Sequence, residues 1–270
     1  MKHMFQMVKE KRKFCICLIL ILGVAFFIVT SYRNARMPVK EQIEKVLNTW
    51  YVRGNVSRTI EELESLLRKT KRKKGDYSKD IVMIEISLAS VYTQTGRYTK
   101  AEERLVEAEK LSRESGLEES PIEDLYKAYG EYEASQNNYE ASLSYYKEAV
   151  QWCNRLYGDN SAQGGAAYLR MSYIYLETDE LEDAEKCAEL AMKPNYSDHR
   201  RLFYINALVT LGDIRMKQEK YQPALSKYEE AYKWYNTIFA TDTKEGALII
   251  GSIQERIKEV KRMMKENGGE

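Results

Sequence analysis

The sequence predicts an all-α protein, a solenoid of antiparallel helix pairs that follows a single transmembrane helix. Three observations support this fold class. A skeleton of small residues returns about every 41 residues, glycine and proline total only 14 and 4 of 270 residues, and nineteen consecutive residues near the N-terminus carry no charge. So little glycine and proline excludes collagen-like and low-complexity chains. The hydrophobic content of 44% is enough for a sizeable core.

The composition also excludes several classes of function. Lysine and arginine total 42 against 41 aspartates and glutamates, a formal charge of +1. This balance gives no argument for specific nucleic-acid binding. The chain has two histidines, His3 and His199, and four cysteines, none in a CxxC spacing. Histidine-pair chemistry, a cysteine-based zinc site and a disulfide framework are therefore unsupported. We expect no metal and no cofactor.

The uncharged stretch, residues 14–32, predicts a membrane anchor. As a helix it spans roughly 28 Å, close to the thickness of a bilayer's hydrocarbon core. The alternative is a cleavable signal peptide, for which Val29 and Ser31 have acceptable small-residue character. The run exceeds the usual hydrophobic region of a signal peptide, so we expect a retained signal anchor. Residues 1–13 then form a short basic tail.

The orientation of the anchor follows from the basic residues beside it. Five precede the segment and four follow it, which is a small bias. The denser cluster and the short tail favour a cytoplasmic N-terminus and an extracytoplasmic repeat domain. Cys15 and Cys17 begin the span, either as small apolar filler or, alternatively, as sites of acylation.

After the anchor, one unit recurs with steps of 41, 42 and 40 residues. Each unit has a small residue on its first helix, another twelve residues later and a third seven residues beyond that. These are Ala89, Gly130, Ser172 and Gly212, then Ala101, Ser142, Ala184 and Ala224, then Ala108, Ala149, Ala191 and Ala231. Small side chains at facing positions let two helix backbones approach, and large ones fill the flanking spaces. Residues 38–240 therefore predict about five helix pairs, the first of them divergent.

The residues expected at the helix starts also agree with this helical prediction. Tyr98, Tyr139 and Tyr221 are expected to open second helices, where a half-buried ring keeps its hydroxyl wet. Residues 120–123, Ser-Pro-Ile-Glu, combine a capping box with proline at the first helical position. Residues 241–270 predict a C-terminal capping helix with one apolar face. That face is formed by Leu248, Ile249, Ile253, Ile257 and Val260.

This pattern of small residues and tyrosines resembles the tetratricopeptide repeat family over about residues 40–240. The period near 41 is similar to the kinesin-light-chain-like subgroup, as is the segment Leu156–Asn160 between repeats. The resemblance implies a right-handed superhelical solenoid whose first helices line a concave groove for a protein or peptide partner. Carried over by position, the partner-binding residues are Ile86, Ser90, Thr93, Lys127, Glu131, Leu169, Arg170, Tyr173, Asn206, Val209 and Asp213.

One run of basic residues has two interpretations. It consists of Arg68, Lys69, Lys71, Arg72, Lys73 and Lys74. It is either a solvated helix C-terminus, where cations oppose the helix dipole favourably, or a patch for an anionic surface such as lipid headgroups. It lacks interleaved aromatic residues, so single-stranded nucleic-acid binding is poorly supported.

No phosphate-binding glycine loop and no HExxH motif occurs, and no arrangement of residues predicts an active site. His199 is expected to be a solvated cap residue, and Cys153 and Cys187 are expected to be packing residues. The sequence thus predicts a membrane-anchored scaffold without enzymatic activity that mediates protein–protein interaction. The alternatives are an accessory or chaperone-like factor of protein export or envelope assembly, or a regulatory subunit of a partner enzyme.

Overall fold

The computed structural model describes residues 37–194, 201–238 and 244–267. The predicted basic tail and anchor, with Cys15 and Cys17, lie outside these residues, as does His199. Among the helices that are described, none is both long and apolar enough to cross a bilayer.

Every regular element in these ranges is a helix, which confirms the all-α prediction. Their order is α2 (Val39–Arg53), α3 (Val56–Lys71), α4 (Ser78–Gln94), α5 (Tyr98–Glu114), α6 (Ile122–Ala134), α7 (Tyr139–Tyr157), α8 (Ala162–Glu177), α9 (Leu181–Met192), α10 (Arg201–Lys217), α11 (Tyr221–Ile238) and α12 (Lys244–Glu266). Tyr98, Tyr139 and Tyr221 begin α5, α7 and α11, as predicted.

The chain divides after Arg72 into two compact units. In the first unit α2 packs against α3. Helix α3 is amphipathic, and its buried apolar side chains follow the helical spacing of Ile60, Leu63 and Leu67. The Asn55 side chain caps its N-terminus by accepting a hydrogen bond from the Arg58 backbone N–H, at 3.1 Å.

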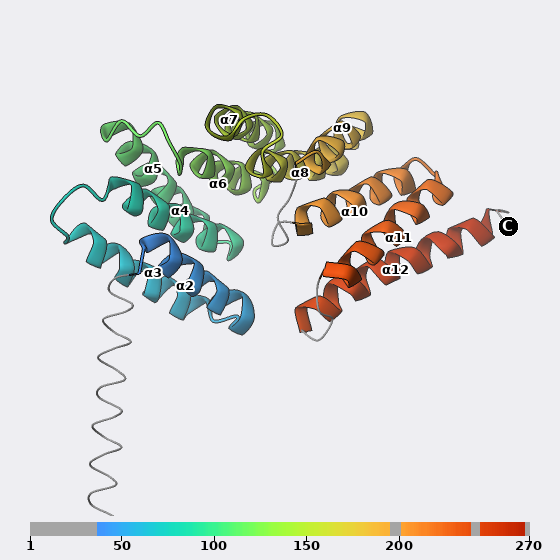
Figure 1. The fold of residues 1–270 in the computed structure, drawn as a ribbon, viewed down its shortest axis with the longest axis horizontal. Coiled ribbons are helices and arrows are strands. Elements are labelled where there is room, and N and C mark those ends of the chain that lie inside the picture. The colour runs from blue at the N-terminus through green and yellow to red at the C-terminus, as the bar shows by residue number, and fades with distance from the viewer. Residues whose placement is uncertain (1–36, 195–200, 239–243, 268–270) are drawn as a thin grey trace, which may run out of the picture. The chain divides into compact units, whose positions relative to one another are not determined.

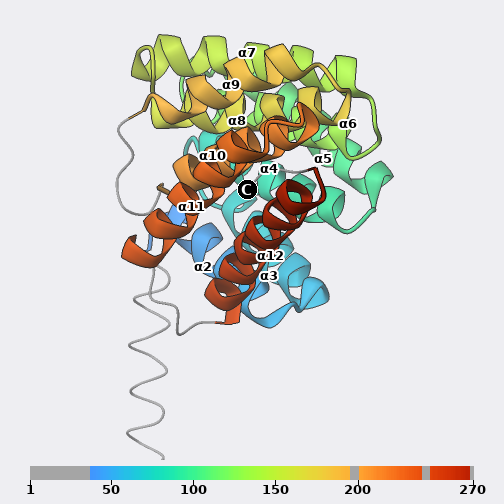
Figure 2. The ribbon, with the colours of Figure 1, turned by 90° about the vertical axis from the view of Figure 1, so that its right-hand side faces the viewer.

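The second unit holds four further helix pairs, α4–α5, α6–α7, α8–α9 and α10–α11, drawn in Figure 1 as neighbouring ribbons. The pairs are antiparallel: Tyr157, the last residue of α7, donates a hydrogen bond to Glu123 near the start of α6, at 2.7 Å. Successive pairs contact through α5–α6, α7–α8 and α9–α10. Helix α12 lies alongside α11 in both Figure 1 and Figure 2.

Two helix pairs of the second unit pack a glycine of the first helix directly against a tyrosine ring of the second. A Cβ added to Gly130 would lie 2.9 Å from the Tyr146 ring, and one added to Gly212 would lie closer still to the Tyr228 ring. Both tyrosines are at most 2% exposed. The small residues predicted on the second helices are also buried, Ser142 and Ala149 in α7 and Ala224 and Ala231 in α11, and each tyrosine lies between them in the sequence.

The other two pairs of the second unit have side chains of different volume at the positions of the glycine and the tyrosine. Sixteen residues separate each glycine from its tyrosine, and the same spacing gives Ala89 with Leu105 and Ser172 with Ala188. All four side chains are buried. A larger residue on the first helix is thus accompanied by a smaller one on the second, as close packing at constant interior volume requires.

Cys153 and Cys187 are free and buried, in agreement with their predicted packing role. Burial raises the pKa of both thiols to about 11. Neutral thiols of this kind behave as small apolar side chains.

Two details of the sequence prediction are wrong. Helix α6 begins at Ile122 after Pro121, without a side-chain cap, because the Glu123 carboxylate of the expected capping box is buried and accepts from Tyr157. Leu248 was expected within the apolar face of α12 but is 74% exposed. The buried stripe of α12 passes through Ile253 and Val260, which leaves Leu248 at its edge.

The glycine–tyrosine contact predicts that Gly212→Ala lowers the free energy of opening of α10 and α11 by about 1–3 kcal/mol, because the added methyl overpacks the site. Hydrogen exchange of these helices measures the change. Gly251→Ala is the matched control: a Cβ there meets nothing within 4 Å, so this change should be neutral or stabilising by up to about 1 kcal/mol.

A second substitution tests the cause. Tyr228→Leu in the Gly212→Ala background gives α10–α11 the alanine–leucine combination of Ala89 and Leu105. It should recover part of the lost stability in a double-mutant cycle. Additive losses would show that the methyl and the ring do not interact.

Candidate functional site

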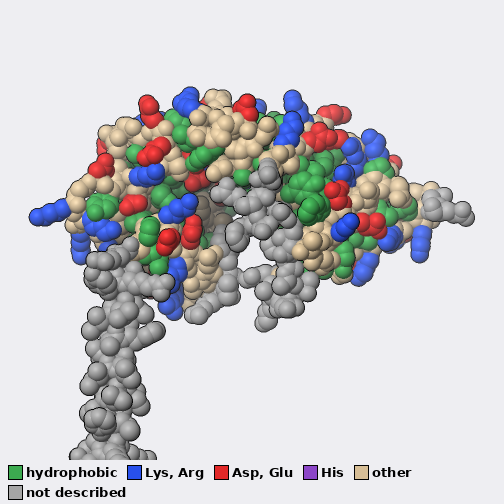
Figure 3. Space-filling model, in the orientation of Figure 1, with side chains coloured by type: hydrophobic (Ala, Val, Ile, Leu, Met, Phe, Trp, Pro, Cys, Tyr) green, Lys and Arg blue, Asp and Glu red, His purple; other side chains and the backbone are tan. Residues whose placement is uncertain are grey.

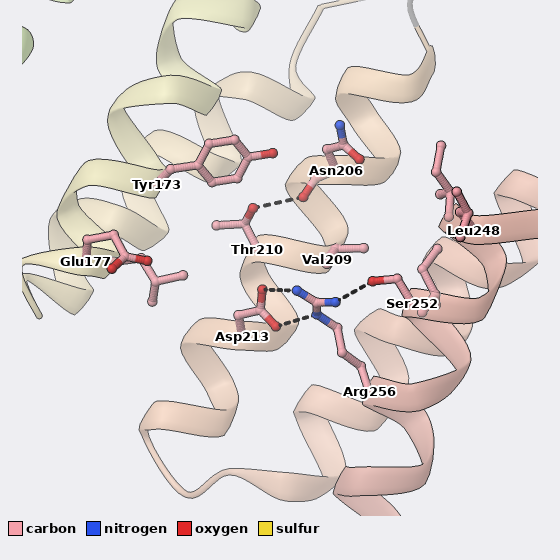
Figure 4. Close-up of a pocket in the computed structure, with 12 residues that line it drawn as sticks. Tyr173, Glu177, Asn206, Val209, Thr210, Asp213, Leu248, Ser252 and Arg256 are labelled. Atoms are coloured by element: carbon pink, nitrogen blue, oxygen red, sulfur yellow. Dashed lines mark hydrogen bonds and ion pairs between the residues drawn. The ribbon is translucent and has the colours of Figure 1, made fainter. Parts of the chain in front are cut away.

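A groove of about 490 Å³ lies in the second unit between α8, α10 and α12 (Figure 4). We call it the α8–α10–α12 groove. It is lined by Tyr173, Leu176, Glu177, Asn206, Val209, Thr210, Asp213, Leu248, Ile249, Ser252, Ile253 and Arg256. Two of its walls are therefore first helices of consecutive repeats, and the third is the C-terminal helix.

The polar centre of this groove is Asp213 on α10. Its Oδ1 accepts hydrogen bonds from the Tyr228 hydroxyl at 2.7 Å and from Arg256 Nε at 2.9 Å. Arg256 Nη1 also donates to Ser252 Oγ at 2.7 Å, as the dashed lines in Figure 4 show. Asp213 thereby joins α10, α11 and α12, and its carboxylate is neutralised within the chain.

Tyr228 and Arg256 each keep one charge state at physiological pH. Burial lowers the pKa of Arg256, but the hydrogen bond and charge of Asp213 outweigh it and raise the pKa overall. Burial, followed by the Asp213 charge, raises the pKa of Tyr228. Tyr228 is thus a neutral donor and Arg256 a fixed cation. The ion-pair side chains are 39% and 30% exposed, so solvent weakens their attraction.

Apart from the carboxylate of Glu177 on α8, the rest of the groove lining is neutral. Burial raises the pKa of Tyr173, whose ring points towards α10 in Figure 4. The Thr210 hydroxyl donates to the Asn206 carbonyl at 2.9 Å. Val209 is half-buried, and Leu248 is 74% exposed. The groove therefore offers apolar contact beside amide, hydroxyl and carboxylate groups.

Four of the residues predicted to bind a partner line this groove together: Tyr173, Asn206, Val209 and Asp213. Three others require correction. Ile86, Thr93 and Leu169 are only 8%, 6% and 3% exposed and belong to the core. Leu169, for example, packs in a core cluster with Ala191 and Ala207, which leaves it no open wall to line.

The remaining predicted positions lie outside the α8–α10–α12 groove. The Lys127 ammonium pairs with Asp124 at 2.5 Å. Burial lowers the pKa of Lys127, but Asp124 outweighs this effect and raises it overall. Glu131 on α6 pairs with Arg170 on α8 at 3.3 Å. Ser90 on α4 is half-buried.

The α12 wall of the groove was missed by sequence reasoning. Leu248, Ser252 and Arg256 lie on a segment assigned only a capping role. One sequence signal could have indicated the Asp213–Arg256 pair. Glu131 and Asp213 each directly follow a glycine that packs against a tyrosine, and each pairs with an arginine on a later helix, Arg170 or Arg256.

The predicted basic run is divided between the two units. Arg68, Lys69 and Lys71 occupy the last turn of α3, and Arg72 follows as its C-cap. In the second unit the Lys73 ammonium lies 4.9 Å from the centre of the Tyr77 ring. All six basic side chains are exposed. On the face displayed in Figure 3, basic and acidic side chains are interspersed.

Residues 121–193 match the model of the tetratricopeptide repeat. No curated protein matches the chain. Among the described residues, no group of three or more histidine, cysteine or acidic side chains is placed to hold a metal ion.

Several solved structures are similar to the chain. BtubC (BKLC) from P. vanneervenii is 20% identical with a TM-score of 0.58, over 76% of this chain and 92% of that one. A kinesin-light-chain-like repeat protein from Podosopora anserina is 14% identical with a TM-score of 0.54, over 72% and 92%. The quorum sensor NprR from B. thuringiensis is 16% identical with a TM-score of 0.55, over 89% and 68%. At these identities the likeness shows the fold, a tetratricopeptide-type helical solenoid.

The Asp213 contacts predict that Arg256→Gln loosens α12. The loss of the pair should lower the free energy of opening of α12 by about 0.5–1.5 kcal/mol, measured by hydrogen exchange. Arg262→Gln is the matched control, because Arg262 on the same helix pairs only with Glu259 and Glu266 among the described residues. Equal exchange rates in the two variants would mean that Asp213 does not hold α12.

Proposed function

We propose that this protein is a non-catalytic, membrane-anchored scaffold that binds a protein or peptide partner in the α8–α10–α12 groove. The observation that carries the proposal is the groove itself, with an exposed leucine beside polar groups on walls from three helices. A concave surface that combines apolar side chains with a few polar groups is typical of binding sites. The right-handed superhelix expected of such repeats would hold the walls in place before a partner arrives.

Preorganisation supports this function. The groove walls are helices, and the Asp213 cluster ties α10 to α11 and α12. A partner therefore meets a surface whose backbone needs little ordering, which reduces the entropic cost of binding. Because Asp213 and Arg256 neutralise each other, we expect selectivity to come from apolar fit, from hydrogen bonds to Asn206 and Tyr173, and from the carboxylate of Glu177.

Membrane attachment is the second part of the proposal, and it rests on the uncharged segment 14–32. An anchor at one end of the solenoid would raise the local concentration of a membrane-bound partner and restrict its orientation. The distribution of basic residues favours display of the repeats on the extracytoplasmic side.

The groove is tested by Leu248→Glu. A carboxylate at this exposed position should weaken capture of the partner at least tenfold in a crosslinking pull-down from native membranes, because it must be desolvated against Val209 and Ile249. Val106→Glu is the matched control. Val106 lies on α5, is 50% exposed and does not line the groove. If both variants lose the partner equally, or both retain it, the groove is not the binding site.

The topology is tested by a reporter that is active only in the cytoplasm, fused after Glu270. We expect no signal, because the cluster before residue 14 should keep the N-terminus inside. A strong signal would reverse the orientation and leave the fold and the groove unaffected.

A further inference from the structure

A second groove, of about 420 Å³, lies within the first unit between α2 and α3. We call it the α2–α3 groove. It is lined by Met37, Gln42, Lys45, Val46, Thr49, Arg58, Glu62, Ser65, Leu66 and Lys69. All these residues precede Arg72, so the groove is complete within the first unit.

The α2–α3 groove combines apolar side chains with cations. Met37, Val46 and Leu66 supply its apolar part, and Leu66 is only 8% exposed. The side chains of Lys45 and Lys69 are exposed. Lysines at such positions can bend along apolar surface while their ammonium groups stay in water or meet an anion.

The charge of this groove is positive. The described residues that line it include three cations, Lys45, Arg58 and Lys69, against the single carboxylate of Glu62. Arg58 Nε donates to that carboxylate at 2.7 Å. Within the part of the chain that the structure describes, this pair uses Nε alone, which leaves both Nη nitrogens of Arg58 as donors. Guanidinium and ammonium groups together form a suitable site for a phosphate anion.

We propose that the α2–α3 groove binds the headgroup of an anionic phospholipid. Its cations would pair with the phosphate, and its apolar side chains would contact the glycerol and upper acyl carbons. The location of the groove in the chain supports this ligand. Val39, the first residue of α2, follows Tyr32 by seven residues, a reach of at most about 25 Å. The proposal thus rests on the membrane anchoring proposed above for residues 14–32.

The experiment uses the full chain in an uncharged detergent, titrated with phosphatidylglycerol or phosphatidylcholine and observed by native mass spectrometry. Wild type should bind one phosphatidylglycerol in preference to phosphatidylcholine. Lys45→Gln with Lys69→Gln should weaken that binding about 10- to 30-fold, since each cation near an anionic headgroup raises the affinity roughly three- to fivefold. The effect should shrink at high salt.

Matched controls separate the groove from overall charge. Lys71→Gln with Lys74→Gln removes two cations of the basic run that do not line the groove, and it should change the affinity less than threefold. Glu62→Gln should tighten binding about threefold because it removes the groove carboxylate. Glu61→Gln makes the same change of net charge on an exposed neighbour outside the groove and should have little effect.

Three results would overturn the proposal: equal weakening by the two lysine pairs, equal affinity for phosphatidylcholine, or displacement of the lipid by inorganic phosphate at similar concentration. The last would make the groove a site for free phosphate. Alkaline extraction of native membranes tests the anchor separately. If the chain is extracted but still prefers phosphatidylglycerol, the lipid site stands and the anchor is wrong. If the chain stays in the membrane but shows no such preference, the anchor stands and the lipid site is wrong.

Discussion

The contact between a first-helix glycine and a second-helix tyrosine determines how α6–α7 and α10–α11 are built, and the polar centre of the groove depends on the second of these pairs. Gly130 and Gly212 leave no room for a methyl against Tyr146 and Tyr228, so the helix backbones approach until the ring fills the space. The ring also carries a hydroxyl past the glycine. In α10–α11 that hydroxyl reaches Asp213, the next residue of the first helix, at 2.7 Å. Close packing thus positions the acid that lies at the centre of the α8–α10–α12 groove.

The same contact explains why α12 takes part in the groove. Asp213, held by Tyr228, accepts from Arg256 and so fixes the first half of α12 opposite α8 and α10. The apolar stripe of α12 through Ile253 and Val260 is buried, which turns Leu248 outward at the groove. A terminal helix in a solenoid ordinarily shields the last repeat from water. Here α12 shields the last repeat with one face and lines the α8–α10–α12 groove with the other.

The helices could be predicted from the sequence because their signals are local. The small-residue spacing, and tyrosines at the starts of α5, α7 and α11, depend only on residues near in the chain. The groove was predicted less well, since a shift of one residue rotates a side chain by about 100° around a helix. Even equivalent positions differ: Leu169 and Val209 each lie three residues before the small residue of the first helix, yet Leu169 is in the core and Val209 is on the groove wall. The Arg256–Asp213 pair spans 43 residues and depends on how α12 rotates against α11, which no local pattern specifies.

The most direct test of the central claim, that the α8–α10–α12 groove binds a protein partner, is site-specific photocrosslinking in native membranes. A photoreactive residue is placed at Val209 or Ser252, which line the groove, and at Val106 as the exposed reference outside it. The account predicts the same partner protein crosslinked from Val209 and from Ser252, and no such adduct from Val106. Adducts from Val106 with none from the two groove positions would contradict it.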